Sequence, residues 1–119
     1  MTGLGRITTV AALSVVLGLG ASAADLKGIL IDVACSANAI KGGQALVTAH
    51  TRECALKEPC VKSGYGVYTQ DGKLIVLDAA GNQMAQTALE ASKKKDNLTV
   101  KINGKQTGEL IEVKSLKII

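Results

Sequence analysis

The chain has 119 residues, of which 47% are hydrophobic and 20% are charged, and its formal net charge is +4. This length suffices for one small domain and excludes an enzyme built from two domains. The composition predicts a packed core rather than a disordered chain. The chain contains no Trp or Phe and only two Tyr residues, so a surface that stacks several bases is not expected, and we expect no nucleic-acid partner.

Residues 1–23 have the pattern of a secretory signal peptide. A short segment with one basic residue, Arg6, precedes an uncharged apolar stretch over residues 7–20, and the small residues 21–23 follow. This order is typical of export signals. We therefore expect cleavage after Ala23, or one residue later, and an exported mature chain, periplasmic or secreted, formed by residues 24–119. Because the apolar stretch is short for a membrane span, no stable membrane insertion is expected after cleavage.

The first half of the mature chain predicts a strand, a loop and a helix. Residues 26–34 form a β-rich run without helical periodicity, and residues 36–43 are small and contain glycines. Residues 44–57 place apolar positions among polar ones as an amphipathic helix does, and Pro59 is expected to end that helix.

A hairpin is predicted next. Residues 66–70 and 73–78 are short β-type runs joined through Asp71 and Gly72, a pair that accepts the positive φ angles of a tight turn. The two tyrosines stand at strand positions here, where we expect them to pack their rings and keep their hydroxyl groups in water.

A second helix and a closing hairpin complete the predicted elements. Asn82 is a candidate cap for a helix that ends near Asp96, and the lysines at 93–95 then meet the negative end of the helix dipole. This structural role is preferred over a surface for anionic lipid, polysaccharide or nucleic acid. Residues 97–103 and 109–119 alternate apolar and polar side chains, as two paired strands do.

Five strands with a helix between the third and the fourth have the connectivity of the OB-fold, a small Greek-key barrel. We therefore expect a mainly β, α+β domain over residues 24–119. It is predicted to be an OB-fold-like five-stranded antiparallel barrel with a helix between strands 3 and 4 and an extra short helix after strand 1.

The three cysteines, Cys35, Cys54 and Cys60, carry the most chemical information. In an oxidising compartment a disulfide is the default fate of neighbouring cysteines, and an odd number leaves one thiol over. One bridge would stabilise a domain of this size by about 2–4 kcal/mol. The spacing does not decide which two cysteines pair.

A metal site is the alternative use of the same residues. The single histidine, His50, precedes Cys54 by four, so the two would share one face of a helix. With Cys35 and Cys60 they form a set of three thiolates and one imidazole, which suits Zn(II) or Cu(I). Asp32 would orient the imidazole or act as an outer partner. The paired Cys-x2-Cys spacings of common zinc modules are missing.

Several motifs of the chain, taken together, resemble those of one group of proteins. They are Gly28-x-x-x-Asp32-x-x-Cys35, His50-x-x-x-Cys54, Cys60-Val61-Lys62-x-Gly64, Asp71-Gly72-Lys73 and Gly104-x-x-x-Gly108-x-x-Ile111-x-Val113-x-Ser115-Leu116. With them the chain resembles a group of small exported bacterial OB-fold-like proteins of unknown function, over nearly all of its mature length. The resemblance implies the barrel fold and the importance of the Cys and His positions, and it transfers neither a substrate nor a reaction.

These observations favour an exported, non-enzymatic binding or interaction module that a disulfide stabilises, with an unknown small ligand or protein as its partner and no cofactor. The alternative is a periplasmic metal-binding protein that holds Zn or Cu(I) with Cys35, His50, Cys54 and Cys60. A thiol enzyme with His50 as base is a third class and is less favoured, because it would need a third orienting group and a cleft that no motif supplies. No catalytic residue is therefore predicted.

Overall fold

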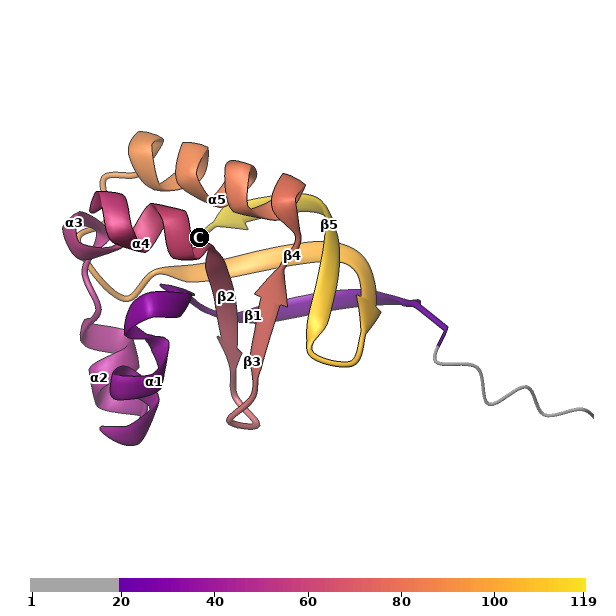
Figure 1. Cartoon of the computed structure of the whole chain (residues 1–119), viewed down its shortest axis with the longest axis horizontal. Coiled ribbons are helices and arrows are strands. Elements are labelled where there is room, and N and C mark those ends of the chain that lie inside the picture. Colours follow the sequence, from indigo (N-terminus) through magenta and orange to yellow (C-terminus); the bar gives the residue numbers. More distant parts are fainter. Residues whose placement is uncertain (1–19) are drawn as a thin grey trace, which may run out of the picture.

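The computed structural model describes residues 20–119. Its five strands close into a barrel in the order β1-β2-β3-β5-β4 (Figure 1), which confirms the expected OB-fold-like architecture. The strands are β1 (Ser22–Asp32), β2 (Tyr65–Thr69), β3 (Leu74–Leu77), β4 (Thr99–Thr107) and β5 (Leu110–Ile118). The helices are α1 (Val33–Lys41), α2 (Gln44–Ala49), α3 (Arg52–Ala55), α4 (Glu58–Ser63) and α5 (Ala79–Ala91).

The barrel is mixed rather than fully antiparallel. β3 and β5 pair in parallel, whereas the other four neighbouring pairs are antiparallel. The prediction of five antiparallel strands is therefore wrong for one pair. The reason is geometric, because an odd number of strands in a closed ring cannot alternate in direction all the way round.

The barrel interior is filled by aliphatic side chains. At the start of β4 and β5 they alternate with exposed side chains, as the period of a half-buried strand requires, whereas the end of β1 is buried at every position from Ile29 to Asp32. Leu30, Val67, Val100 and Ile111 are fully buried. At Gly28, where β1 pairs with β2, a Cβ would collide with the carbonyl oxygen of Tyr68. Glycine is therefore required where these two strands approach closely.

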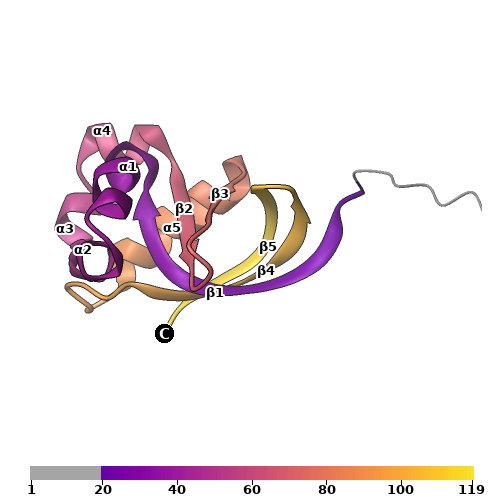
Figure 2. The ribbon, with the colours of Figure 1, turned by 90° about the horizontal axis from the view of Figure 1, so that it is seen from below.

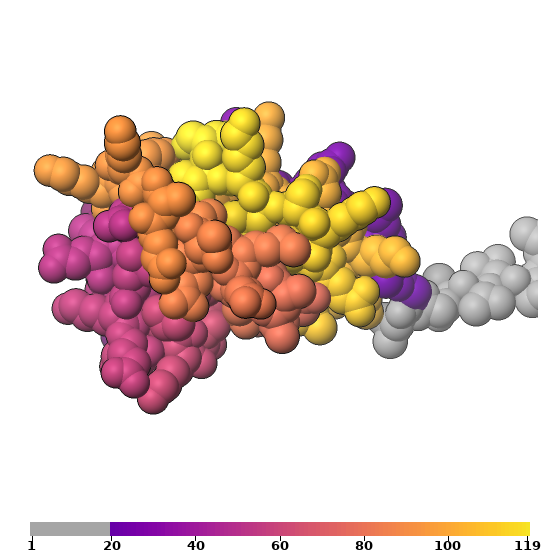
Figure 3. Space-filling model, turned by 90° about the horizontal axis from the view of Figure 1, so that it is seen from above, coloured from indigo at the N-terminus to yellow at the C-terminus, as the bar shows by residue number. Residues whose placement is uncertain are grey.

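Helix α5 covers one side of the barrel and lies next to β5 (Figure 3). It begins earlier than predicted because the Asp78 carboxylate caps it, accepting a hydrogen bond from the Gly81 amide at 2.9 Å. It also ends earlier, at Ala91, with an extended residue at Ser92. The lysines at 93–95 therefore lie beyond the helix, and the predicted role for them within its last turn is wrong.

The β1–β2 connection, residues 33–64, holds four short helices (Figure 2). It leaves and re-enters the barrel at one point, since Asp32 pairs with Tyr65. The predicted loop at 36–43 lies largely within α1, and the predicted helix at 44–57 is interrupted at His50, where ψ is 130°. Pro59 stands in the first turn of α4, where its missing N–H costs nothing, so it helps to begin a helix instead of ending one.

The predicted signal peptide lies largely outside the described residues. Ser22 and Ala23 are described, and they form the start of β1, where they pair with Gln106 and Lys105. Cleavage after Ala23 would remove these two residues from the strand and keep the rest of it. Within residues 20–119 no helix has both the length and the apolar character needed to cross a membrane.

Candidate metal centre

Each cysteine is the third residue of a short helix, and this shared position explains how the three come together. Cys35, Cys54 and Cys60 follow the capping residues of α1, α3 and α4 by three positions. The Asp32 carboxylate accepts a hydrogen bond from the Cys35 amide at 3.0 Å, and the Thr51 hydroxyl accepts one from the Cys54 amide at 3.1 Å. Side-chain caps of this kind fix the start of a helix, and with it the direction of the third side chain.

The three thiols converge although they come from three helices. Their Sγ atoms lie within 4.8 Å of one another. Cys60 is buried, whereas Cys35 and Cys54 are partly exposed. The cluster thus lies just below the surface, between the end of β1 and the inserted helices.

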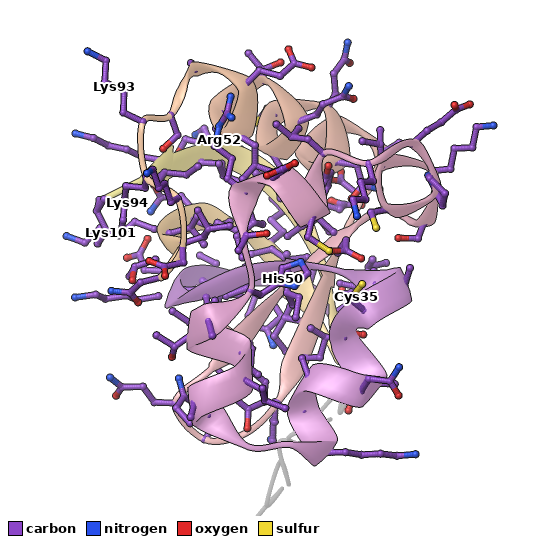
Figure 4. All side chains as sticks on the ribbon, turned by 90° about the vertical axis from the view of Figure 1, so that its left-hand side faces the viewer. Cys35, His50, Arg52, Lys93, Lys94 and Lys101 are labelled. Atoms are coloured by element: carbon purple, nitrogen blue, oxygen red, sulfur yellow. The ribbon has the colours of Figure 1, made fainter. Side chains whose placement is uncertain are left out.

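Asp32 and His50 form a second group that shares Cys35 with the first. His50 Nε2 lies 2.6 Å from Asp32 Oδ1, and the Asp32 side chain has no exposed surface. The ligand atoms of Asp32, His50 and Cys35 lie within 4.8 Å of one another, and Figure 4 shows His50 and Cys35 near each other at this end of the molecule. The expected role of Asp32 as the partner that orients the imidazole is therefore consistent with the geometry.

Burial and hydrogen bonding shift the pKa values of Asp32, Cys35 and Cys60. Burial raises the pKa of Asp32, but the hydrogen bonds from His50 and the Cys35 amide outweigh it, so the pKa falls below its usual value. Burial and the adjacent carboxylate raise the pKa of Cys35 to about 12, and the same two causes raise the pKa of Cys60. These thiols are protonated at neutral pH, which disfavours Cys35 as an activated nucleophile in the metal-free protein.

The predicted helical pairing of His50 with Cys54 is wrong. His50 follows the last residue of α2 and Cys54 lies in α3, because the extended backbone at His50 separates the two helices. His50 groups with Asp32 and Cys35, and it does not group with Cys54 or Cys60. The predicted set of four ligands therefore divides into a three-sulfur cluster and an imidazole that a carboxylate holds to one side.

The position of α3, and with it of Cys54, depends on two residues that the sequence analysis did not select. The guanidinium of Arg52 donates hydrogen bonds to the carbonyl oxygens of Leu89 and Glu90 in the last turn of α5, at 2.5 and 2.9 Å. The hydroxyl of Tyr65, which is buried rather than in water as predicted, donates to the carbonyl oxygen of Ala55 at 2.7 Å. These contacts join α3 to α5 and to β2.

Replacing Tyr65 by phenylalanine tests the second contact. The change leaves the buried carbonyl of Ala55 without its partner, and we expect the free energy of unfolding to fall by about 1–3 kcal/mol. Tyr68→Phe is the matched control, because Tyr68 is only half-buried, and it should change stability by less than about 0.5 kcal/mol. Chemical denaturation of both variants measures the difference. Equal losses would contradict the assigned role of the Tyr65 hydroxyl.

A depression of about 650 Å³ lies far from the cysteines, toward the other end of β1. Its lining comes from β1, β4 and β5 and includes Ala23, Asp25, Lys105 and Glu112. It contains none of the predicted site residues. The three cysteines and His50 therefore lie in the helical insertion, away from this depression.

No protein-family model, curated protein or solved structure matches the chain. The protein is a small OB-like barrel. Its β1–β2 insertion brings three thiols and an imidazole close to the buried carboxylate at the end of β1.

Proposed function

We propose that the protein binds one soft metal cation, Cu(I) in the first place, through the thiolates of Cys35, Cys54 and Cys60. The convergence of three sulfur atoms from three helices carries this proposal. A disulfide needs two sulfurs, whereas three thiolates make a complete trigonal set for a soft cation. A metal–sulfur bond of about 2.3 Å places neighbouring sulfurs about 4 Å apart, a separation compatible with the 4.8 Å limit within which these Sγ atoms lie.

Asp32 supports a cation at this position. Its buried carboxylate provides negative charge beside Cys35 and Cys60, and it keeps their thiols protonated until a cation displaces the protons. Binding therefore releases protons and should strengthen as the pH rises. Zn(II) is the alternative metal, and because it takes four ligands, His50, which does not group with Cys54 or Cys60, would have to move toward these sulfurs to complete its shell.

We place this function in an exported protein, on the strength of the signal pattern at residues 1–23. A non-enzymatic binding module stabilised by a disulfide is the second candidate. The observation that favours it is the same proximity, since two sulfurs within 4.8 Å need only a small movement to reach the S–S bond length of about 2.05 Å.

Metal titration of the reduced protein, residues 24–119, tests the first candidate. We expect about one Cu(I) per chain, with all three thiols protected from alkylation. His50→Ala should keep Cu(I) affinity within about threefold, whereas Cys54→Ser should lower it on the order of a hundredfold, because the first variant keeps all three sulfur ligands that a soft cation prefers and the second removes one. A large loss in His50→Ala would instead indicate the four-ligand set. Thiols that react at equal rates with and without metal would contradict the proposal.

A further inference from the structure

Three lysines stand side by side on the outside of the barrel. Lys27 on β1 pairs with Lys101 on β4, and Lys101 pairs in turn with Lys117 on β5. All three side chains are exposed. Directly opposed residues on antiparallel strands have their Cβ atoms about 5 Å apart, and like charges in such pairs destabilise the sheet. This row therefore has an electrostatic cost within the folded protein.

Acidic side chains do not neutralise the row within the described part of the chain. There, the ion pairs within 4.0 Å are Lys62 with Glu58 and His50 with Asp32. Asp25 stands two residues before Lys27 on β1, and its carboxylate accepts a hydrogen bond from Asn103. Among the described residues, no carboxylate lies within 4.0 Å of the three ammonium groups, so the row keeps an excess of positive charge.

The loop after α5 adds basic residues on the same side. Figure 4 shows Lys93, Lys94 and Lys101 projecting together, and Lys94 Nζ donates to the carbonyl oxygen of Ile119, beside the end of β5, at 2.8 Å. Arg52, not these lysines, binds the last-turn carbonyls of α5. Lys93 is exposed, and Lys94 adds its positive charge at the end of β5. We call Lys27, Lys93, Lys94, Lys101 and Lys117 the cationic face.

We propose that the cationic face binds the surface of a bilayer that contains anionic phospholipids. A shallow depression of about 330 Å³ lies within it, lined by Asp25, Leu26, Lys27, Lys101, Ile102 and Asn103, and two of these side chains offer ammonium groups to a phosphodiester headgroup. Ile119, which is 40% exposed, gives the edge of the face an apolar contact. Lysines around an exposed aliphatic side chain are typical of proteins that lie on a membrane surface.

Nucleic acid fits this face less well. Tyr65 is buried and Tyr68 is half-buried, so residues 20–119 present no fully exposed aromatic ring on which bases could stack. The row is exposed on three neighbouring strands of a closed barrel, where a broad partner can contact its members together.

Co-sedimentation with vesicles tests the inference. The probes are vesicles of phosphatidylcholine alone and vesicles in which about a third of the lipid is phosphatidylglycerol. Each lysine near an anionic surface contributes about fivefold to the apparent affinity. The triple variant K27Q/K101Q/K117Q should therefore bind the anionic vesicles on the order of a hundredfold more weakly. The control K41Q/K57Q/K73Q has the same net charge and changes exposed lysines on other elements, so it should lose less than about fivefold.

Stability measurements keep the test interpretable. Because Lys101 has a like charge on both sides, Lys101→Gln should raise Tm by a few degrees while it lowers vesicle binding about fivefold. Binding that persists in 0.5 M salt, equal losses in the two triple variants, or no binding of the unmodified protein would overturn the inference. Stronger binding to a DNA duplex or to an anionic polysaccharide than to anionic vesicles would overturn it as well, and would assign the face to that polymer.

Discussion

Asp32→Ala is expected to lower the free energy of unfolding by about 3–5 kcal/mol, the largest stability effect that we predict for a single polar side chain. The carboxylate is fully buried, caps α1 through the Cys35 amide, and lies 2.6 Å from His50. Its removal leaves the imidazole without a partner and the helix without its cap. Chemical denaturation in the presence of a reductant measures the change.

Two further variants separate the roles of this carboxylate. Asp32→Asn keeps an oxygen that can cap α1 and removes the negative charge, so it should lose less stability than Asp32→Ala. His50→Ala keeps the cap and leaves the carboxylate buried with one fewer partner. If all three variants were within 1 kcal/mol of the unmodified protein, Asp32 would have no structural role, and the site described above would need to be revised.

The pH dependence of stability is a second measure of the same group. The pKa of Asp32 is lower in the folded protein than its usual value of 3.8. Its contribution to stability is therefore fully present above pH 3.8 and is lost as the pH falls through the lower, folded value. Asp32→Ala should lack this acid-dependent component, whereas a control variant such as Asp96→Ala, at an exposed loop position, should retain it.

The strands could be predicted from the sequence because alternation of apolar and polar residues is a local signal. Residues 97–103 and 109–119 show this alternation, and they overlap β4 and β5, although β4 begins at Thr99 and continues to Thr107. The helices were harder because their ends depend on single capping side chains. Asp32 and Thr51 cap α1 and α3, and an Asp or Thr three residues before a cysteine was a usable signal for both helices.

The sequence analysis selected the residues of the candidate site, but it did not predict how they are arranged in space. Cys35, Cys54 and Cys60 were selected for their chemistry alone, and the fold brings them together. The interrupted helix placed His50 beside Asp32, a contact across 18 residues that no local periodicity could show. The Lys27, Lys101 and Lys117 row was likewise invisible, because it depends on the register of three strands that are distant in sequence.

Oxidation should abolish metal binding, and this effect distinguishes the two candidate functions. A mild oxidant is expected to join two of the three cysteines and to leave one titratable thiol, because an odd thiol cannot pair within the chain. One remaining sulfur cannot replace three, so Cu(I) affinity should fall at least a hundredfold. Prior loading with Cu(I) should protect all three thiols, since thiolates bound to a metal react slowly with oxidants.

Thermal unfolding then compares the stability of the Cu(I)-bound reduced protein with that of the oxidised protein. If metal binding is the function, the reduced protein with Cu(I) at a hundred times its Kd should be stabilised by about 2.7 kcal/mol relative to the metal-free form. If a cross-link is the function, the oxidised protein should gain about 2–4 kcal/mol over the reduced one without any metal, and reduction should lower its Tm. If oxidation stabilised the protein and Cu(I) had no effect, two of these cysteines would be assigned to a structural disulfide. The reason is that their proximity would then contribute to stability and not to metal binding.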